Sequence, residues 1–420
     1  MPKKSKKRSA GRGKKEVKKE PKKSSLGVYA LVLVVFLLIA VSIFVALRKQ
    51  PSQESQAKAP GKTAVNNSQL QKTNNSGASA VPKKAFKFEK FIPYSEGHVY
   101  KAEWGDYNND GRADLAVANY NRQNYIFVNE NGTFTKNAQF GDGYTVDLKW
   151  ADFNNDGKLD LVAARYNQPS SVYINNGDGT FAESSLFGKT YAKAVAVADF
   201  NKDGWIDIAI GNDLHSTDLY TNDKNGGFDH MELDKGGLHV TALAACDFSG
   251  DGWPDLAIGT DFQKNYLYIN NKDGTFTESV QFGEGFHTLS MACADFNNDG
   301  LNDLAVGNNN QASNIDRNYL YINNGNFDFT QSSQFGASKA YGLAPADFDN
   351  DGWIDLAVGN YDQQSYVYLN NHDGTFTQVS QFGLDYVHDI KTDDIDNDGD
   401  IDVATALDKN GVAIYYNQMK

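Results

Sequence analysis

Cysteine and proline are scarce in this chain, with 2 Cys and 9 Pro among 420 residues. Two cysteines cannot form the dense disulfide framework that holds small secreted domains together. Cys246 precedes Asp247 by one residue, and Cys293 precedes Asp295 by two. Successive side chains of a strand point to opposite faces, so these two positions differ in direction. We therefore expect two buried thiols and no disulfide between them.

Signatures of catalysis are also lacking. The sequence contains no Gly-x-Ser-x-Gly turn, no phosphate-binding glycine loop and no His or Cys pair at zinc-site spacing. We therefore predict a binding protein and not an enzyme. A lyase or hydrolase built from surface loops, with His98, His239 and His287 as its titratable groups, stays open as an alternative.

Charge is distributed unevenly near the amino terminus. Residues 1–23 hold twelve Lys/Arg and two Glu, and residues 24–47 are uncharged and mostly apolar. About 20 apolar residues cross a bilayer, whereas a cleavable signal peptide has an apolar core of about 7–15 residues. We predict a transmembrane signal-anchor helix at 24–47. The basic tail 1–23 then stays in the cytoplasm, by the positive-inside rule, and contacts anionic lipid.

The remainder of the chain divides into a linker and one acidic domain. Residues 48–84 are rich in Gln, Asn, Ser and Lys without apolar periodicity, which is typical of a disordered stalk. Residues 85–420 hold 21 Lys/Arg and 50 Asp/Glu, a net charge of −29. Such a domain repels nucleic acid. We expect a single-pass membrane protein whose acidic domain lies at the cell surface or in the periplasm.

A nine-residue pattern, Asp-x-[Asn/Asp/Ser]-x-Asp-Gly-x-x-Asp, occurs seven times in this domain at intervals of 46 to 52 residues. Ca²⁺ takes about six to eight oxygen ligands, and oxygen-bearing side chains at alternate loop positions can surround one ion. Positions 1, 3, 5 and 9 supply side chains, position 7 supplies a carbonyl, and glycine at position 6 permits the turn. The pattern predicts about seven bound Ca²⁺, with metal-free Asx turns as the alternative.

The predicted metal ligands are the residues at positions 1, 3, 5, 7 and 9 of each loop. They are Asp106, Asn108, Asp110, Arg112 and Asp114; Asp152, Asn154, Asp156, Lys158 and Asp160; Asp199, Asn201, Asp203, Trp205 and Asp207; Asp247, Ser249, Asp251, Trp253 and Asp255; Asp295, Asn297, Asp299, Leu301 and Asp303; Asp347, Asp349, Asp351, Trp353 and Asp355; and Asp394, Asp396, Asp398, Asp400 and Asp402. We expect the fourth loop, with Ser249, to bind least well. The sixth and seventh, with Asp349 and Asp396, have an additional carboxylate and are expected to bind best.

Short runs rich in β-branched residues follow each loop, such as Leu-Ala-Val and Ile-Ala-Ile, and predict strands. The sixth copy reads Ala-Asp-Phe-Asp-Asn-Asp-Gly-Trp-Ile-Asp-Leu-Ala-Val-Gly-Asn, then Tyr-Val-Tyr-Leu-Asn-Asn-His-Asp-Gly-Thr-Phe and Gln-Phe-Gly. This unit resembles the FG-GAP/VCBS repeat family, whose best-known members form the propeller of integrin α-subunits. The resemblance covers residues 85–420. It implies an all-β, seven-bladed β-propeller with Ca²⁺ on one face and ligands on the opposite face.

The seventh copy ends after its third strand, so the ring needs a strand from elsewhere. Aligned on the motif, Phe88 matches Phe134 and Tyr94 matches Phe140. We therefore predict that residues 86–94 complete the seventh blade and remove its exposed edges. Three consecutive inner strands also carry charged pairs where the others have small residues: Asp389/Lys391, Lys101/Glu103 and Asp147/Lys149. These predict an ion-pair ladder between blades or, alternatively, a polar subsite in the channel.

Aromatic and imidazole side chains recur near the face opposite the loops. Eight positions before six of the seven motifs stand His98, Tyr144, Tyr191, His239, His287 and Tyr386. The sixth motif has Lys339 there, with Tyr341 two residues later, and three second strands end near Tyr120, Tyr166 and Tyr361. Such groups beside amides suit neutral polar ligands such as sugars, although repeated packing contacts explain them equally. We predict a calcium-binding adhesion module for a glycan or protein ligand. The alternative is an accessory or scaffold subunit of a surface complex.

Overall fold

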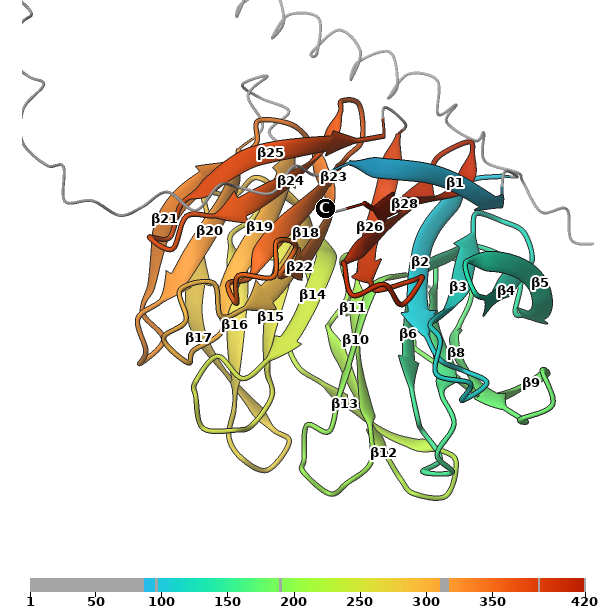
Figure 1. The fold of residues 1–420 in the computed structure, drawn as a ribbon. Helices are drawn as coiled ribbons and strands as arrows, with labels where there is room; N and C mark the ends of the chain where they lie inside the picture. The colour runs from blue at the N-terminus through green and yellow to red at the C-terminus, as the bar shows by residue number, and fades with distance from the viewer. Residues whose placement is uncertain (1–86, 95–96, 189–190, 310–316, 384–385, 419–420) are drawn as a thin grey trace, which may run out of the picture. The chain divides into compact units, whose positions relative to one another are not determined.

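The computed structural model describes residues 87–94, 97–188, 191–309, 317–383 and 386–418. These residues form 28 strands in seven four-stranded antiparallel sheets, arranged as the blades of a β-propeller (Figure 1). The all-β, seven-bladed prediction is confirmed. No helix among the described residues is long and apolar enough to cross a membrane. The predicted segments 1–23, 24–47 and 48–84 lie outside them.

Each of blades 1 to 6 is formed from four consecutive strands. Blade 1 contains β2 (Val99–Gly105), β3 (Asp114–Asn119), β4 (Asn124–Glu130) and β5 (Thr133–Phe140); blade 2 contains β6 (Thr145–Ala151), β7 (Asp160–Arg165), β8 (Ser170–Asn175) and β9 (Phe181–Phe187). Blade 3 contains β10 (Ala192–Ala198), β11 (Asp207–Asn212), β12 (Asp218–Asn222) and β13 (Phe228–Glu232); blade 4 contains β14 (Val240–Cys246), β15 (Asp255–Thr260), β16 (Asn265–Asn270) and β17 (Phe276–Phe282). Blade 5 contains β18 (His287–Ala294), β19 (Asp303–Asn309), β20 (Asn318–Asn323) and β21 (Phe329–Phe335); blade 6 contains β22 (Ala340–Ala346), β23 (Asp355–Asn360), β24 (Ser365–Asn370) and β25 (Phe376–Phe382).

Blade 7 joins the two ends of the domain. Its sheet has the order β1 (Phe88–Tyr94), β28 (Gly411–Asn417), β27 (Asp402–Leu407), β26 (Val387–Asp393). Phe88 lies opposite Asn417, and Tyr94 lies opposite Val412. The prediction that the amino-terminal strand completes this blade is confirmed for the described residues. The Phe88 ring also packs 5.5 Å from that of Phe382 in blade 6, which seals the ring between blades.

Burial varies systematically across a blade. The second strand of each blade is short, mostly apolar and buried along its whole length, as in β11 and β15. The outermost strands are mostly exposed, as in β9 and β17. The inner strands β2, β6, β10, β14, β18, β22 and β26 follow one another around the ring, each packed against the next (Figure 1).

The second residue of each loop holds neighbouring blades together. Phe200 and Phe248 are completely buried, and the Phe200 ring lies 5.6 Å from that of Phe276 in blade 4. The Phe200 carbonyl also accepts a hydrogen bond from the Asn270 side chain of that blade at 2.7 Å. The third loop is therefore anchored to blade 4, the blade that follows it.

The expectation of two free thiols is wrong. Cys246 in β14 and Cys293 in β18 form a disulfide, with Cα atoms 6.7 Å apart. Side chains do alternate along each strand, as we argued. Neighbouring inner strands, however, turn opposite faces toward the seam that they share. Positions of opposite parity therefore meet between blades 4 and 5, and the alternation favours the disulfide.

Candidate functional site

The calcium-motif loops are built around their own backbone amides. In the second loop, Asp152 accepts hydrogen bonds from the N–H groups of Asp156 at 3.1 Å and Gly157 at 2.8 Å. The Asn154 side chain also accepts from Asp156 N–H, at 2.9 Å. Gly157 has a φ of 84° with open space where a Cβ would be, so backbone conformation explains the glycine. These contacts direct the oxygens of positions 1 and 3 into the loop.

The carboxylate at position 9 lies deeper. Asp160 is completely buried, and its two oxygens accept from the N–H groups of Asn175 at 2.8 Å and Phe153 at 3.0 Å. Burial raises the pKa of Asp160 to about 6, despite these hydrogen bonds. The same cause raises the pKa of Asp355 in the sixth loop to about 7. Each loop thus contains a desolvated carboxylate without a cationic partner among its nearest contacts, an environment that favours a bound cation.

Two loops bring several carboxylates closest together. Oxygens of Asp347, Asp349 and Asp355 lie within 4.8 Å of one another, and so do those of Asp394, Asp396 and Asp398. These are the sixth and seventh loops, in which position 3 is Asp. Burial, and next the Asp398 carboxylate, raise the pKa of Asp396. The hard oxygen donors of these loops fit Ca²⁺.

Basic side chains lie beside five of the position-5 carboxylates, a feature that the sequence did not reveal. The pairs are Arg112 with Asp110, Lys158 with Asp156 at 2.7 Å, Lys224 with Asp203 at 3.2 Å, Lys272 with Asp251 at 3.2 Å and His372 with Asp351 at 2.8 Å. The last three basic side chains come from the hairpin between the third and fourth strands. Each follows its aspartate by 21 residues, and this constant offset is the sequence signal that could have revealed them.

Neighbouring loops also contact each other through position 4. The Asn109 side chain donates to the carbonyl of Gly157 in the next loop at 3.2 Å. Asn155 and Asn298 make the equivalent bonds to Gly204 and Gly352, at 3.0 and 3.3 Å. Ordering one loop therefore helps to position the next.

The opposite face is formed where second strands end and inner strands begin. In blade 1, Val99 pairs with Asn119 at this end, and Gly105 pairs with Asp114 at the loop end. Where the structure describes both residues, the residue just after a second strand meets the residue eight positions before the next motif. We call each such contact a seam pair, because it joins two blades.

Nine of the ten predicted ligand residues lie in these seam pairs, and the tenth, Tyr341, lies two residues beyond the seam position of blade 6. Three pairs are tyrosines, with ring centroids 4.4 Å apart for Tyr120 and Tyr144, 6.2 Å for Tyr166 and Tyr191, and 5.2 Å for Tyr361 and Tyr386. Three others join Asp to His: Asp213 to His239 at 2.7 Å, Asp261 to His287 at 3.4 Å, and Asp408 to His98 at 2.8 Å. The side chains therefore do pack between blades. Tyr120, Tyr191 and Tyr386 nevertheless remain 42%, 39% and 49% exposed.

Two further residues, missed from the sequence, connect the tyrosine pairs. Tyr100 and His388 stack with ring centroids 4.7 Å apart, and the Tyr144 hydroxyl donates to that of Tyr100 at 3.0 Å. The centroid of the Tyr361 ring lies 5.3 Å from that of His388 and 4.9 Å from that of Tyr341. We call the connected set the tyrosine arc: Tyr341, Tyr361, Tyr386, His388, Tyr100, Tyr120, Tyr144, Tyr166 and Tyr191. Tyr100, Tyr341 and His388 share one repeat position, six residues before the motif.

Glutamines beside the arc have structural partners. The Gln123 side chain donates to the Gly141 carbonyl at 2.5 Å, and Gln168 donates to the Asp142 carbonyl at 2.8 Å. They fix the loop that leads into blade 2. The arc itself offers mainly ring faces and phenolic hydroxyls to a ligand.

The sequence of this chain matches the model of one known protein family. The family model described as FG-GAP-like repeat matches residues 106–163, 152–210, 199–258, 247–306, 295–358 and 347–405. The chain belongs to the FG-GAP-like repeat family. No curated protein matches the sequence. The fold of this FG-GAP propeller is similar to two solved structures of BBS1N in complex with ARL6DN, one soaked with mercury and one with lead. In each, the TM-score is 0.57 at 12% identity, over 79% of this chain and 97% of the other.

The channel of the FG-GAP propeller contains the predicted ion-pair ladder. Glu103 accepts from Lys149 at 3.0 Å and lies 2.9 Å from Lys391, while Lys101 contacts Asp389 at 3.1 Å. These contacts join blades 7, 1 and 2, as expected. Burial alone would raise the pKa of Glu103, but the ammonium groups of Lys149 and Lys391 hold it at about 2.

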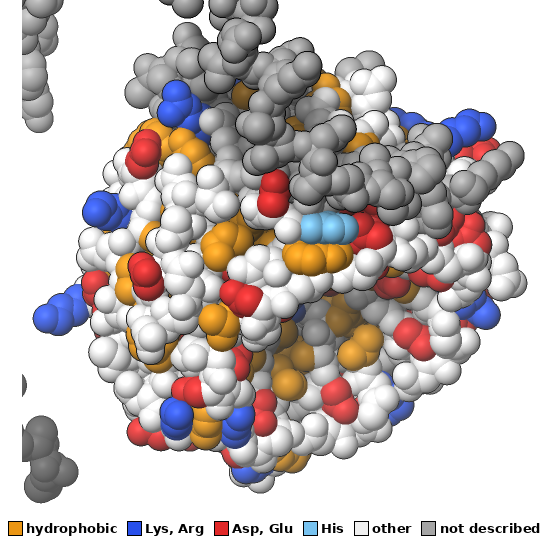
Figure 2. Space-filling model, turned by 60° about the vertical axis from the view of Figure 1, so that its left-hand side comes forward, with side chains coloured by type: hydrophobic (Ala, Val, Ile, Leu, Met, Phe, Trp, Pro, Cys, Tyr) orange, Lys and Arg blue, Asp and Glu red, His pale blue; other side chains and the backbone are white. Residues whose placement is uncertain are grey.

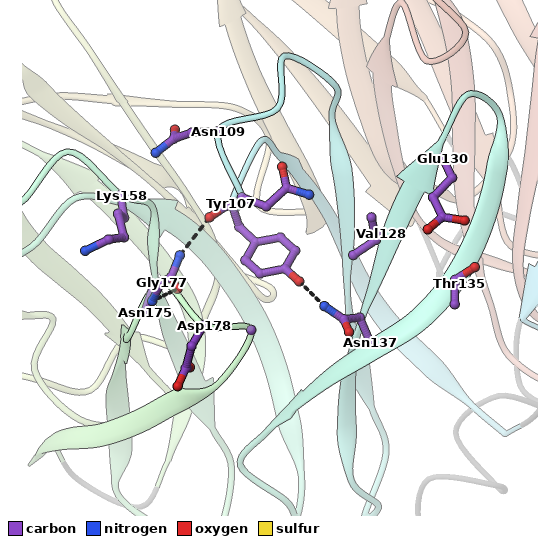
Figure 3. Close-up of a pocket in the computed structure, with 12 residues that line it drawn as sticks. Tyr107, Asn109, Val128, Glu130, Thr135, Asn137, Lys158, Asn175, Gly177 and Asp178 are labelled. Carbon is purple, nitrogen blue, oxygen red and sulfur yellow. Dashed lines mark hydrogen bonds between the residues drawn. The ribbon is translucent and has the colours of Figure 1, made fainter.

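A polar cavity of about 420 Å³ lies between blades 1 and 2 of the FG-GAP propeller, beside the first two loops (Figure 3). Tyr107, which replaces the phenylalanine of most other loops, accepts from the Asn137 side chain at 2.5 Å. Its carbonyl accepts from Asn175 at 2.8 Å. The tyrosine ring itself is buried, so the cavity presents mainly amide and charged groups. Figure 2 shows another part of the surface, where apolar side chains line a hollow among scattered Asp and Glu.

Proposed function

We propose that this chain is a membrane-tethered FG-GAP propeller that binds Ca²⁺ through its loops and a glycan on its tyrosine arc, outside the cytoplasm. The arc is the observation that carries the proposal. Its rings form a connected surface across blades 6, 7, 1, 2 and 3, and three of them are about 40–50% exposed. Aromatic faces contact sugar C–H groups, and phenols hydrogen-bond hydroxyls.

The electrostatics of the domain narrow the ligand to neutral glycans. The 21 Lys/Arg and 50 Asp/Glu of residues 85–420 repel polyanions such as sulfated or uronic acid polymers. Bound Ca²⁺ would reduce the net negative charge on the face that carries the calcium-motif loops, without changing the side chains that the arc offers to a ligand.

Calcium binding is supported by the donor set of the loops. Each loop combines hard oxygens with a buried carboxylate, and such cages are stabilised by a divalent cation. The extracytoplasmic location is supported by two independent features. The basic segment 1–23 precedes an uncharged span at 24–47, and disulfides such as Cys246–Cys293 form in oxidising compartments.

Glycan arrays test the ligand. The domain should bind neutral oligosaccharides, and Tyr191→Ala and Tyr386→Ala should each weaken binding about tenfold, since stacking of one ring contributes about 1–1.5 kcal/mol. Leu186→Ala, an equally accessible change on the outer strand β9, should leave binding unaltered. An array without any bound glycan would reject the glycan proposal. Turnover of labelled polysaccharides would instead support the enzyme alternative.

Protease protection tests the topology. Protease added to intact cells should cut the stalk 48–84 and release a soluble propeller. Protection until lysis would place the domain in the cytoplasm and contradict the proposal. A mature chain that begins just after residue 47 would show that the anchor is cleaved.

A further inference from the structure

Two exposed apolar residues on the face of the seam pairs have an unusual backbone conformation. Leu214 and Phe262 follow the second strands of blades 3 and 4 at equivalent positions. They are 56% and 63% exposed, and their φ angles are 59° and 56°. We call them the apolar tips.

Left-handed backbone is disfavoured for bulky side chains, because their Cβ crowds the carbonyl oxygen. Blades 1 and 2 make the same turn with Asn121 and Asn167, whose φ angles are 55° and 68°. Asparagine tolerates this conformation well. Leucine and phenylalanine therefore occupy a position where a polar residue would be both less strained and better solvated. Strain of this kind persists most often where a side chain has a function.

The two tips lie close to each other in the structure. Leu214 N–H donates to the Leu238 carbonyl at 2.8 Å, and Asp261 N–H donates to the His239 carbonyl at 2.8 Å. The consecutive residues Leu238 and His239 thus bridge the backbone of Leu214 and that of Asp261, which directly precedes Phe262. The carboxylates of Asp213 and Asp261, paired with His239 and His287, flank the tips.

We propose that the apolar tips are a docking site for a protein partner that presents an apolar recess bordered by Lys and Arg. Projecting Leu and Phe side chains fill recesses in protein surfaces, and desolvated aromatic anchors contribute most of the binding energy there. The aspartates beside the tips, within a domain of net charge −29, supply the charge complementarity. Leu214 borders the Tyr191 end of the tyrosine arc, since Asp213 N–H donates to the Tyr191 carbonyl at 2.9 Å, but the proposal does not depend on the glycan.

Other occupants fit less well. A second copy would bring two strongly acidic domains together. An anionic bilayer would be repelled by the same aspartates. A sugar would gain little from Leu214, which has neither a flat ring nor a hydrogen-bonding group.

Site-specific photo-crosslinking in cells, with the full chain, tests the proposal. A photoreactive residue at position 214 should crosslink one protein through a peptide rich in apolar and basic residues. Phe262→Asn should reduce the yield at least tenfold. A photoreactive residue at Leu186, equally exposed on β9, provides the control and should not crosslink that protein. Glycan binding should be unchanged in the variants at Phe262 and Leu186.

Thermal denaturation gives a second, independent readout. Leu214→Asn and Phe262→Asn should each raise Tm by about 1–3 °C by relieving strain, while Leu186→Asn should not. The proposal would be overturned if position 214 crosslinked to a second copy of the chain. It would also be overturned if the chain bound phosphatidylglycerol vesicles and Phe262→Asn abolished that binding. Tip variants that melt below the natural chain, or a crosslinked peptide of acidic character, would overturn it as well.

Discussion

Carboxylates of the loops are held in two different environments. The position-5 group is accessible and often paired with a cation, whereas the position-9 group is buried and accepts only backbone hydrogen bonds. A bound cation would contact both. The strength of each site should then depend on position 3, which varies from Ser249 to Asp349 and Asp396.

Two matched substitutions test this dependence. Asp351→Ala and Asp251→Ala each remove a position-5 carboxylate with one basic neighbour, His372 or Lys272. With Ca²⁺ present, Asp351→Ala should lower Tm more, because loop 6 brings three carboxylates together. Losing a site saturated about 100-fold above its Kd costs about 2.7 kcal/mol. In EDTA the difference between the variants should disappear, and equal losses in Ca²⁺ would argue against a tighter sixth site.

The channel ladder predicts a pH dependence. The folded-state pKa of Glu103 is about 2, below its ordinary value of 4.5. Its stabilisation is therefore complete above pH 4.5 and is lost as pH falls toward 2. Near neutral pH, Glu103→Gln should cost about 3–5 kcal/mol, because Lys149 loses its carboxylate partner and Lys391 keeps only the Asp389 carboxylate nearby. In urea denaturation, the gap to the natural chain should narrow below pH 4.5, and the exposed control Glu284→Gln should show neither effect.

Strands and their connections determine the stability of the ring. β1 is the outermost strand of blade 7 and closes the ring. Without it, β28 would expose an unpaired edge. A chain that begins at Ser95 should melt well below one that begins at Ala85, and it should associate through the open edge. Melting and sedimentation measure both effects. Equal Tm values for two monomeric chains would contradict the role of β1.

The disulfide links the inner strands of blades 4 and 5 across 47 residues. Closing a loop of this length stabilises a fold by about 4 kcal/mol in the chain-entropy model. Cys246→Ser and Cys293→Ser should each lower Tm to a similar extent, and the double variant should lower it no further. Mass spectrometry without reductant should find both cysteines in one crosslinked peptide pair. Free thiols in the purified propeller would refute the linkage.

Sequence patterns predicted features that repeat within a blade. The loops, the second strands, the closing strand at residues 86–94 and the charged pairs of three inner strands all follow from motif spacing. Features that depend on how two blades face each other were missed or misjudged. The Cys246–Cys293 bond joins blades 4 and 5, and the stacking of Tyr100 on His388 joins blades 1 and 7. The pairing of Lys272 with Asp251 was missed for a related reason, because it joins two connections of blade 4 whose relative orientation no single-strand rule contains.

At the scale of the whole domain, metal and folding should be coupled. We expect elemental analysis of the Ca²⁺-saturated domain to find about seven ions, because seven loops share the donor set. Chelation should lower Tm substantially, since a ligand specific to the folded state stabilises it. Mg²⁺ should restore little of the loss, because it demands a smaller octahedral site. A stoichiometry near zero, or melting indifferent to EDTA, would reject the calcium assignment.

The pairing of Phe88 with Asn417 has a consequence for biosynthesis. β1 is the first strand of the domain to leave the ribosome, and its partner β28 is the last. Blades 1 to 6 can fold as they are made, but blade 7 can form only once β28 has been synthesised. Until then β1 remains an unpaired, largely apolar strand that can pair with another chain. A ribosome stalled before residue 411 should therefore carry six folded blades and an open ring.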